Sequence, residues 1–89
     1  MKIKDGFVFQ EIADDYIVVP VGETTNDVHG IIKLNETGAF LWKCMTENDL
    51  SFEELAELLV KKYSLGKEDA QKDVNNFIVK LNSFGCLEN

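Results

Sequence analysis

Residues 27–42 read DVHGIIKLNETGAFLW, and this stretch decides the fold. It contains a glycine and a short run of branched apolar residues, which is typical of a strand over residues 30–34. Asn35 follows at once, and asparagine is among the side chains that best cap the first turn of a helix. Glu36 then places a carboxylate in that first turn, where the helix dipole favours it. The stretch therefore predicts a strand that passes directly into a helix ending at about Met45.

The expected helix after Asn35 is apolar on most of its sides. Its apolar side chains are Phe40, Leu41, Trp42, Cys44 and Met45. Such a helix is buried in the centre of a protein and does not lie on its surface. Gly38 and Ala39 are small enough to let it approach its neighbours closely, and Trp42 is expected to anchor the core.

Two further strands are predicted upstream of this stretch. Residues 7–12 are rich in aromatic and β-branched side chains, and residues 16–21 have the same character. Asp14 and Asp15 between them predict a tight turn. Residues 22–27 have the composition of a loop, so the first third of the chain predicts a three-stranded antiparallel meander.

Two more helices are predicted downstream. Ser51 and Glu54 have the spacing of a capping box, in which each side chain bonds the backbone N–H of the other residue. The helix that they open carries one apolar stripe, made by Phe52, Leu55, Ala56, Leu59 and Tyr63. A third helix is expected from Lys67 to about Phe84, with Gly85 placed to cap its C-terminus. Its apolar side comprises Ala70, Val74, Phe77, Ile78, Leu81 and Phe84.

This order of elements defines the expected fold class. Three strands precede three helices, and the 89 residues contain no internal repeat and no linker-like tract. We therefore expect a single α+β domain over residues 1–89. It should be winged-helix-like, with a three-stranded antiparallel sheet followed by a three-helix bundle.

The composition indicates a small globular protein with an acidic surface. Hydrophobic residues make up 45% of the chain and charged residues 28%, and the net charge is −7. Nucleic acids and anionic lipids are bound through Lys and Arg, so we expect neither as a partner, and a cationic protein or peptide fits better. No apolar stretch approaches 18 residues, and Cys44 and Cys86 are far apart. We therefore expect a cytoplasmic protein with reduced thiols and no membrane segment.

The sequence contains no recognisable catalytic or metal-binding pattern. Its one histidine, His29, has no nucleophile motif to act on and is interpreted as a surface or turn residue. A zinc site needs about four ligands, usually in paired spacings, which one histidine and two distant cysteines do not supply. The acidic residues at helical spacing are interpreted as solvated surface: Glu53, Glu54, Glu57, Glu68, Asp69 and Asp73. We expect no catalytic residue, metal or cofactor.

The stretch from Gly30 to Trp42 resembles the hallmark of the PqqD-like family. The shared elements are the glycine, the short apolar strand, Leu34-Asn35, the small residues at 37–39 and Trp42. The resemblance continues through the second and third expected helices and covers about residues 7–87. Members of this family are recognition elements, or chaperones, for the leaders of ribosomally made peptides that are modified after translation.

The resemblance implies a function and a site. The leader of a precursor peptide would add as an extra strand beside the third strand, in a groove against the third helix. The strand side would be formed by Gly30, Ile31, Ile32, Lys33 and Leu34. The helix side would be formed by Asp73, Val74, Phe77, Ile78 and Leu81, with Asn76 and Lys80 at the rim. Because several of these residues also suit a core stripe, periodicity does not decide which flank of the helix faces the peptide.

The resemblance also implies partners. The domain would present the precursor to a modifying enzyme, commonly a radical SAM maturase with its own iron–sulfur clusters, and the enzyme would need a second surface. The acidic faces of the second and third helices are candidates for that surface. Three alternatives stay open: a constitutive enzyme subunit without leader binding, a winged-helix DNA-binding domain, and a homodimer through the free edge of the third strand. The third helix has no net positive charge, which disfavours DNA.

Overall fold

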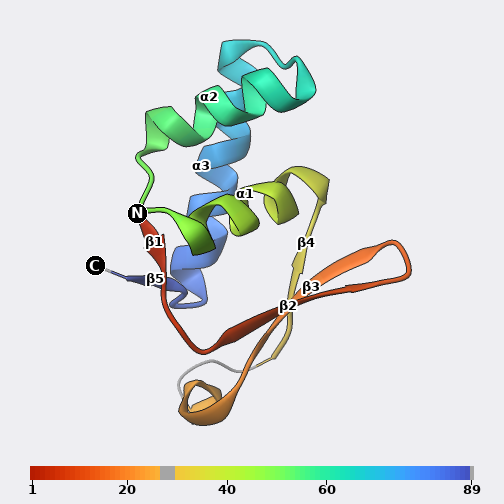
Figure 1. Ribbon diagram of the computed structural model, residues 1–89, viewed down its shortest axis with the longest axis vertical. Coiled ribbons are helices and arrows are strands. Elements are labelled where there is room, and N and C mark those ends of the chain that lie inside the picture. Colours follow the sequence, from red (N-terminus) through yellow and green to blue (C-terminus); the bar gives the residue numbers. More distant parts are fainter. Residues whose placement is uncertain (27–29, 89) are drawn as a thin grey trace.

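The computed structural model describes residues 1–26 and 30–88, in which a twisted sheet leads into three helices (Figure 1). The sheet has the order β2-β3-β4, and both pairings are antiparallel. Its strands are β2 (Phe7–Ile12), β3 (Asp15–Pro20) and β4 (Ile32–Leu34). The helices are α1 (Glu36–Glu47), α2 (Phe52–Tyr63) and α3 (Lys67–Ser83). The predicted fold class, a three-stranded antiparallel sheet followed by three helices, is confirmed.

Several boundaries differ from the prediction. Strand β4 is shorter than expected, because Gly30 has a φ of +93° and Ile31 lies outside the ladder. The β2–β3 turn is at Ala13 and Asp14, one position earlier than expected, with Ala13 in the left-handed region at a φ of 55°. Val28 and His29, with the neighbouring Asp27, lie outside the described residues.

Three short elements were not predicted. Strands β1 (Lys2–Ile3) and β5 (Leu87–Glu88) pair antiparallel, so the two ends of the chain lie side by side (Figure 1). A single 3₁₀ helix, η1 (Gly22–Asn26), replaces the expected loop. Two-residue strands show no periodicity, so only tertiary contacts define β1 and β5.

The first two helices begin where their capping residues predict. The Asn35 side chain accepts a hydrogen bond from the Gly38 backbone N–H at 2.7 Å, which satisfies one free donor of the first turn of α1. Ser51 and Glu54 form the expected capping box of α2, with both hydrogen bonds at 3.1 Å. Each cap fixes the point at which the chain turns into its helix.

The C-terminus of α3 is a Schellman motif. Gly85 has a φ of 71° and donates to the carbonyl of Asn82, while Cys86 donates to the carbonyl of Leu81. Gly85 is required because side chains other than glycine are strained in this conformation. The motif reverses the chain toward β5.

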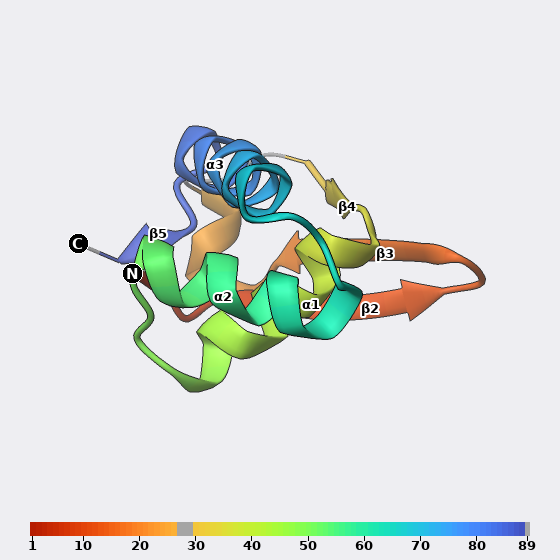
Figure 2. The same cartoon turned by 90° about the horizontal axis from the view of Figure 1, so that it is seen from above.

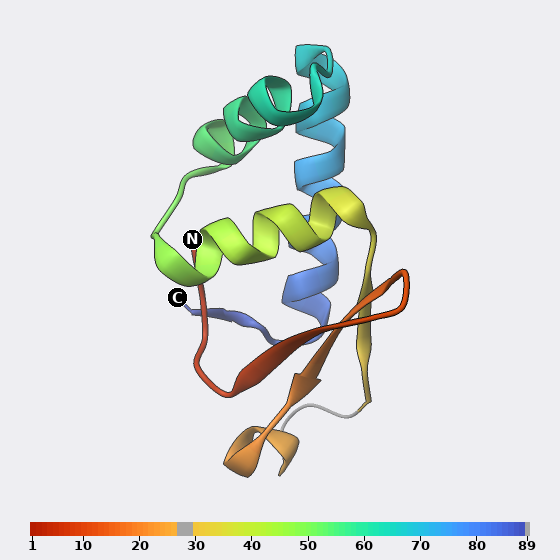
Figure 3. The ribbon, with the colours of Figure 1, turned by 45° about the vertical axis from the view of Figure 1, so that its right-hand side comes forward.

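Helix α1 lies between α2 and the sheet and is the centre of the core (Figure 3). Leu41, Trp42 and Met45 are buried, as the apolar character of this helix predicted, whereas Phe40 and Cys44 are half-buried. The Trp42 ring is 2% exposed and packs edge-on against Phe7, with ring centroids 6.0 Å apart. Within the part of the chain that is described, no helix has the length and apolar character needed to cross a membrane.

Burial makes Cys86 a source of pH-dependent stability. Desolvation raises the pKa of the Cys86 thiol from 9.0 to about 11. In the unfolded chain the thiol ionises first, so the unfolded state is favoured as the pH rises from about 9 to about 11. We predict that the free energy of unfolding in urea falls over this range, and that Cys86→Ala shows a shallower fall than the wild type. Equal slopes for the two proteins would contradict this assignment.

Candidate functional site

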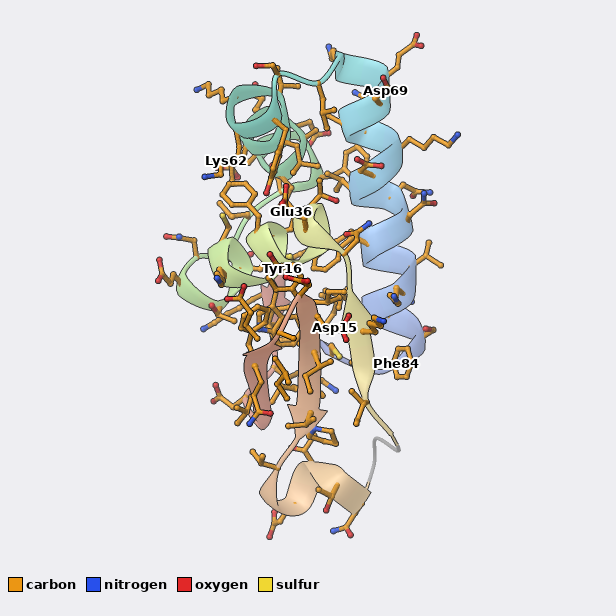
Figure 4. The ribbon with its side chains drawn as sticks, turned by 90° about the vertical axis from the view of Figure 1, so that its right-hand side faces the viewer. Asp15, Tyr16, Glu36, Lys62, Asp69 and Phe84 are labelled. Atoms are coloured by element: carbon orange, nitrogen blue, oxygen red, sulfur yellow. The ribbon has the colours of Figure 1, made fainter. Side chains whose placement is uncertain are left out.

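A cleft lies between β4 and α3, at the edge of the sheet. In both views that show this edge, β4 stands between β3 on one side and α3 on the other (Figures 2 and 4). The cleft encloses about 170 Å³. It is lined by Leu34, Asn35, Thr37, Gly38, Asp73, Asn76, Phe77 and Lys80. Its walls are therefore the strand-to-helix junction and one flank of α3.

The side chains of β4 alternate between the core and the surface. Ile32 and Leu34 are buried, at 0% and 4% exposure, and Lys33 between them points to the solvated face. The Lys33 ammonium lies 3.3 Å from the Asp15 carboxylate on β3. Both groups are well exposed, so this ion pair contributes little to stability.

The backbone of Lys33 faces α3. Its carbonyl accepts a hydrogen bond from the Lys80 ammonium, which reaches across from the helix. In an antiparallel strand the N–H and C=O of one residue point to the same side. The Lys33 N–H therefore also faces the cleft, and among the described residues no strand pairs with this edge of β4.

The floor of the cleft is apolar and includes a glycine. A Cβ atom on Gly38 would lie 3.5 Å from the Phe77 ring, which is an ordinary contact, and 3.0 Å from the capping oxygen of Asn35, which is a tight one. Glycine thus leaves room for the cap of α1. Phe77 is 6% exposed and Leu34 4%, so the two side chains close the bottom of the cleft against the core.

The rim of the cleft is polar, and its lower end is apolar. Asp73, Asn76 and Lys80 project from successive turns of α3 on the flank that faces β4. Figure 4 shows the half-buried Phe84 at the C-terminal end of α3. Ile31, just before β4, is 60% exposed.

The structure brings together some of the residues predicted for the site. Leu34, Asp73, Asn76, Phe77 and Lys80 line the cleft, and Lys33 supplies a carbonyl to it. Ile32, Val74 and Leu81 are fully buried, so their side chains belong to the core. Ile78 does not line the cleft, because its 100° rotation from Phe77 is away from Asn76. Gly30 and Ile31 precede the ladder and are exposed.

Sequence reasoning missed part of this cleft. Asn35 and Thr37 were interpreted as a helix start, and Gly38 as a residue that permits close packing, yet all three line the cleft. The signal that could have found them is their position directly after β4, whose open edge forms the other part of this wall.

The described residues were also compared with the requirements of a metal centre. In residues 1–26 and 30–88, no group of three or more His, Cys, Asp or Glu side chains is arranged to hold a metal ion. The cleft instead combines an open strand edge, an apolar floor and a rim of mixed charge.

Comparison with known families identifies the fold that carries this cleft. The family described as coenzyme PQQ synthesis protein D (PqqD) matches residues 22–87. The chain belongs to the PqqD family. The matched region contains both β4 and α3, so both walls of the cleft are part of the PqqD pattern.

Solved structures share the complete PqqD fold of this chain. One is described as TbiB1 in complex with the TbiA(beta) leader peptide, with a TM-score of 0.76, 24% sequence identity, and coverage of 100% of this chain and 96% of that chain. Another is a lasso peptide synthetase B1 complexed with the leader peptide, with a TM-score of 0.73, 16% identity, and coverage of 99% and 96%. No curated protein matches the sequence.

Proposed function

We propose that this PqqD-family chain is a non-catalytic recognition domain that binds the leader of a ribosomally made precursor peptide. The leader would add as a strand to the outer edge of β4, in the cleft against α3. The observation that carries the proposal is the backbone of Lys33, whose carbonyl faces this cleft with no strand, in the described residues, paired to it. The two solved relatives, both complexes with leader peptides, support the same assignment.

Strand addition explains how so small a cleft binds a peptide. An extended segment beside β4 would accept from the Lys33 N–H and donate to the Lys33 carbonyl, while alternate side chains of the segment would point to opposite faces. One set would point at the floor formed by Leu34, Gly38 and Phe77. Affinity would come from the backbone bonds, and specificity from the side chains that meet this floor.

The candidate residues would contribute to peptide binding in different ways. Lys33 would act through its backbone, while Asp73, Asn76 and Lys80 would contact peptide side chains at the rim. Phe84 and the exposed Ile31 provide apolar surface for a residue further along the peptide. The buried side chains Ile32, Val74 and Leu81 would contribute by positioning β4 and α3.

The second partner in this proposal is a modifying enzyme, with a radical SAM maturase as the expected class. Tethering of the leader would raise the concentration of the attached peptide at that enzyme's active site. The enzyme would need a surface away from the cleft. A hollow between α2 and α3 offers one. Its apolar residues Ala56 and Val60 are bordered by side chains of both charges: Glu53, Glu57, Lys61 and Lys67. The domain itself would contribute neither a catalytic group nor a cofactor.

A proline at Lys33 tests strand addition directly. Lys33→Pro removes the N–H that faces the cleft, and proline is tolerated in an edge strand when the missing donor points away from the neighbouring strand. We predict a roughly fivefold loss of affinity for the leader of a short open reading frame encoded beside the gene, since one backbone bond contributes about 1 kcal/mol. Fluorescence anisotropy of the labelled leader measures this loss.

Lys33→Ala is the matched control for that variant. It keeps the backbone donor and removes only the exposed ion pair with Asp15, so the affinity should change less than threefold. Equal binding by the proline variant and the wild type would exclude strand addition. Loss of binding in both variants would assign the affinity to the Lys33 side chain.

Two adjacent asparagines on α3 provide a test of whether the peptide binds in the cleft. Asn76 lines it, whereas Asn75 is exposed and does not line it. Asn76→Trp should weaken leader binding by at least about tenfold, since an indole would occupy much of the 170 Å³ that a peptide needs. Asn75→Trp should leave the affinity unchanged, with calorimetry as the measurement. Equal effects of the two substitutions would place the peptide elsewhere.

A further inference from the structure

The Lys80 ammonium occupies the carbonyl that a leader strand would use. It donates a hydrogen bond to the Lys33 backbone oxygen in the peptide-free chain. A peptide strand that pairs with the same edge of β4 donates its own backbone N–H to that oxygen. Both donors approach this oxygen from the cleft, so a strand bound there would take the space in which the ammonium now lies.

We propose that this competition makes Lys80 a specificity-determining residue, which favours leaders with an Asp or Glu beside the leader residue that pairs with Lys33. The inference rests on the proposed function, because it assumes that a peptide strand binds at β4. A carboxylate at that position would accept the displaced ammonium. A neutral peptide would leave the exposed ammonium with water or uncharged acceptors only.

The side chains that line the cleft together with Lys80 offer uncharged acceptors and only one carboxylate, that of Asp73. Within residues 1–26 and 30–88, ion pairs are formed only by the N-terminal ammonium with Asp49 and by Lys33 with Asp15. The residue one turn earlier on the same flank of α3 is Asn76, which is neutral. Asp73, which lines the cleft, is seven residues and about two helical turns away.

The negative charge of the whole chain restricts the preference for an acidic residue to the peptide position that meets Lys80. The net charge is −7, so an acidic peptide is disfavoured over most of the surface. An acidic side chain at the correct position of the strand meets the Lys80 ammonium, whereas acidic residues elsewhere gain nothing. Specificity would thus come from a favourable contact with Lys80 at one peptide position and from repulsion of acidic residues at the other positions, a combination that specific interfaces often use.

The contact itself is testable without any peptide. Lys80→Met keeps much of the aliphatic chain but removes the donor, so the carbonyl ¹³C chemical shift of Lys33 should change. Lys72 lies on the same helix, is exposed and does not line the cleft, so Lys72→Met should leave that shift unchanged. An unchanged Lys33 carbonyl in Lys80→Met would overturn the proposal at its first step.

Selection from a library of random peptides of about 15 residues, displayed on yeast, tests the preference. Peptides enriched by the wild-type protein and by Lys72→Met should carry Asp or Glu at one fixed position, and those enriched by Lys80→Met should not. Replacing that acid by its amide should weaken binding to the wild type by roughly 3- to 10-fold. The same replacement should leave binding to Lys80→Met unchanged.

The outcomes separate this inference from the proposed function. Wild-type protein that enriches neutral peptides, or Lys80→Met that keeps the acidic preference, would overturn the role of Lys80 while leaving strand addition intact. Loss of the preference in Lys72→Met as well would assign it to the charge of the helix and overturn the role of Lys80. Wild-type protein that enriches no peptide would overturn both proposals.

Discussion

An open strand edge held opposite a helix is the constraint on which the rest of this structure depends. A β-strand needs partners for its N–H and C=O groups on both sides, and β4 has β3 on only one of them. On the other side stands α3, whose backbone bonds are satisfied within the helix. Only side chains can reach across, and Lys80 does so. Lys80 thus shields the edge of β4 from pairing with strands of unrelated proteins. A strand that enters the cleft can still reach this edge.

The junction between β4 and α1 sets the width of the cleft between β4 and α3. Asn35 ends β4 and caps α1, so strand and helix have a fixed relation to each other. Gly38 then leaves room for the Asn35 cap at the point where the first turn of α1 meets Phe77 on α3. Helix α1 is central and its Trp42 is buried in the core. Its position therefore affects the packing of both the sheet and the other two helices. Folding and the geometry of the cleft therefore depend on the same few residues.

Most of the fold could be predicted from local signals. The caps at Asn35 and Ser51 and the glycine at Gly85 specify helix ends by hydrogen bonds between residues close in sequence. The cleft was harder to predict, because it depends on which flank of α3 faces β4. That choice separates Asn76 from Ile78, although both are near Phe77, and it is decided by packing between distant segments. The pairing of β1 with β5 was missed for the same reason.

The most direct test of the account is amide hydrogen exchange of ¹⁵N-labelled protein, with and without the leader of a neighbouring short open reading frame. The Lys33 N–H faces the cleft without a strand partner in the described residues, so the account predicts fast exchange in the free protein. Bound leader should slow that exchange markedly, because a new backbone bond protects this N–H. Asn75, on the exposed side of α3, provides an internal reference. Tight binding of the leader with unchanged exchange at Lys33 would contradict strand addition.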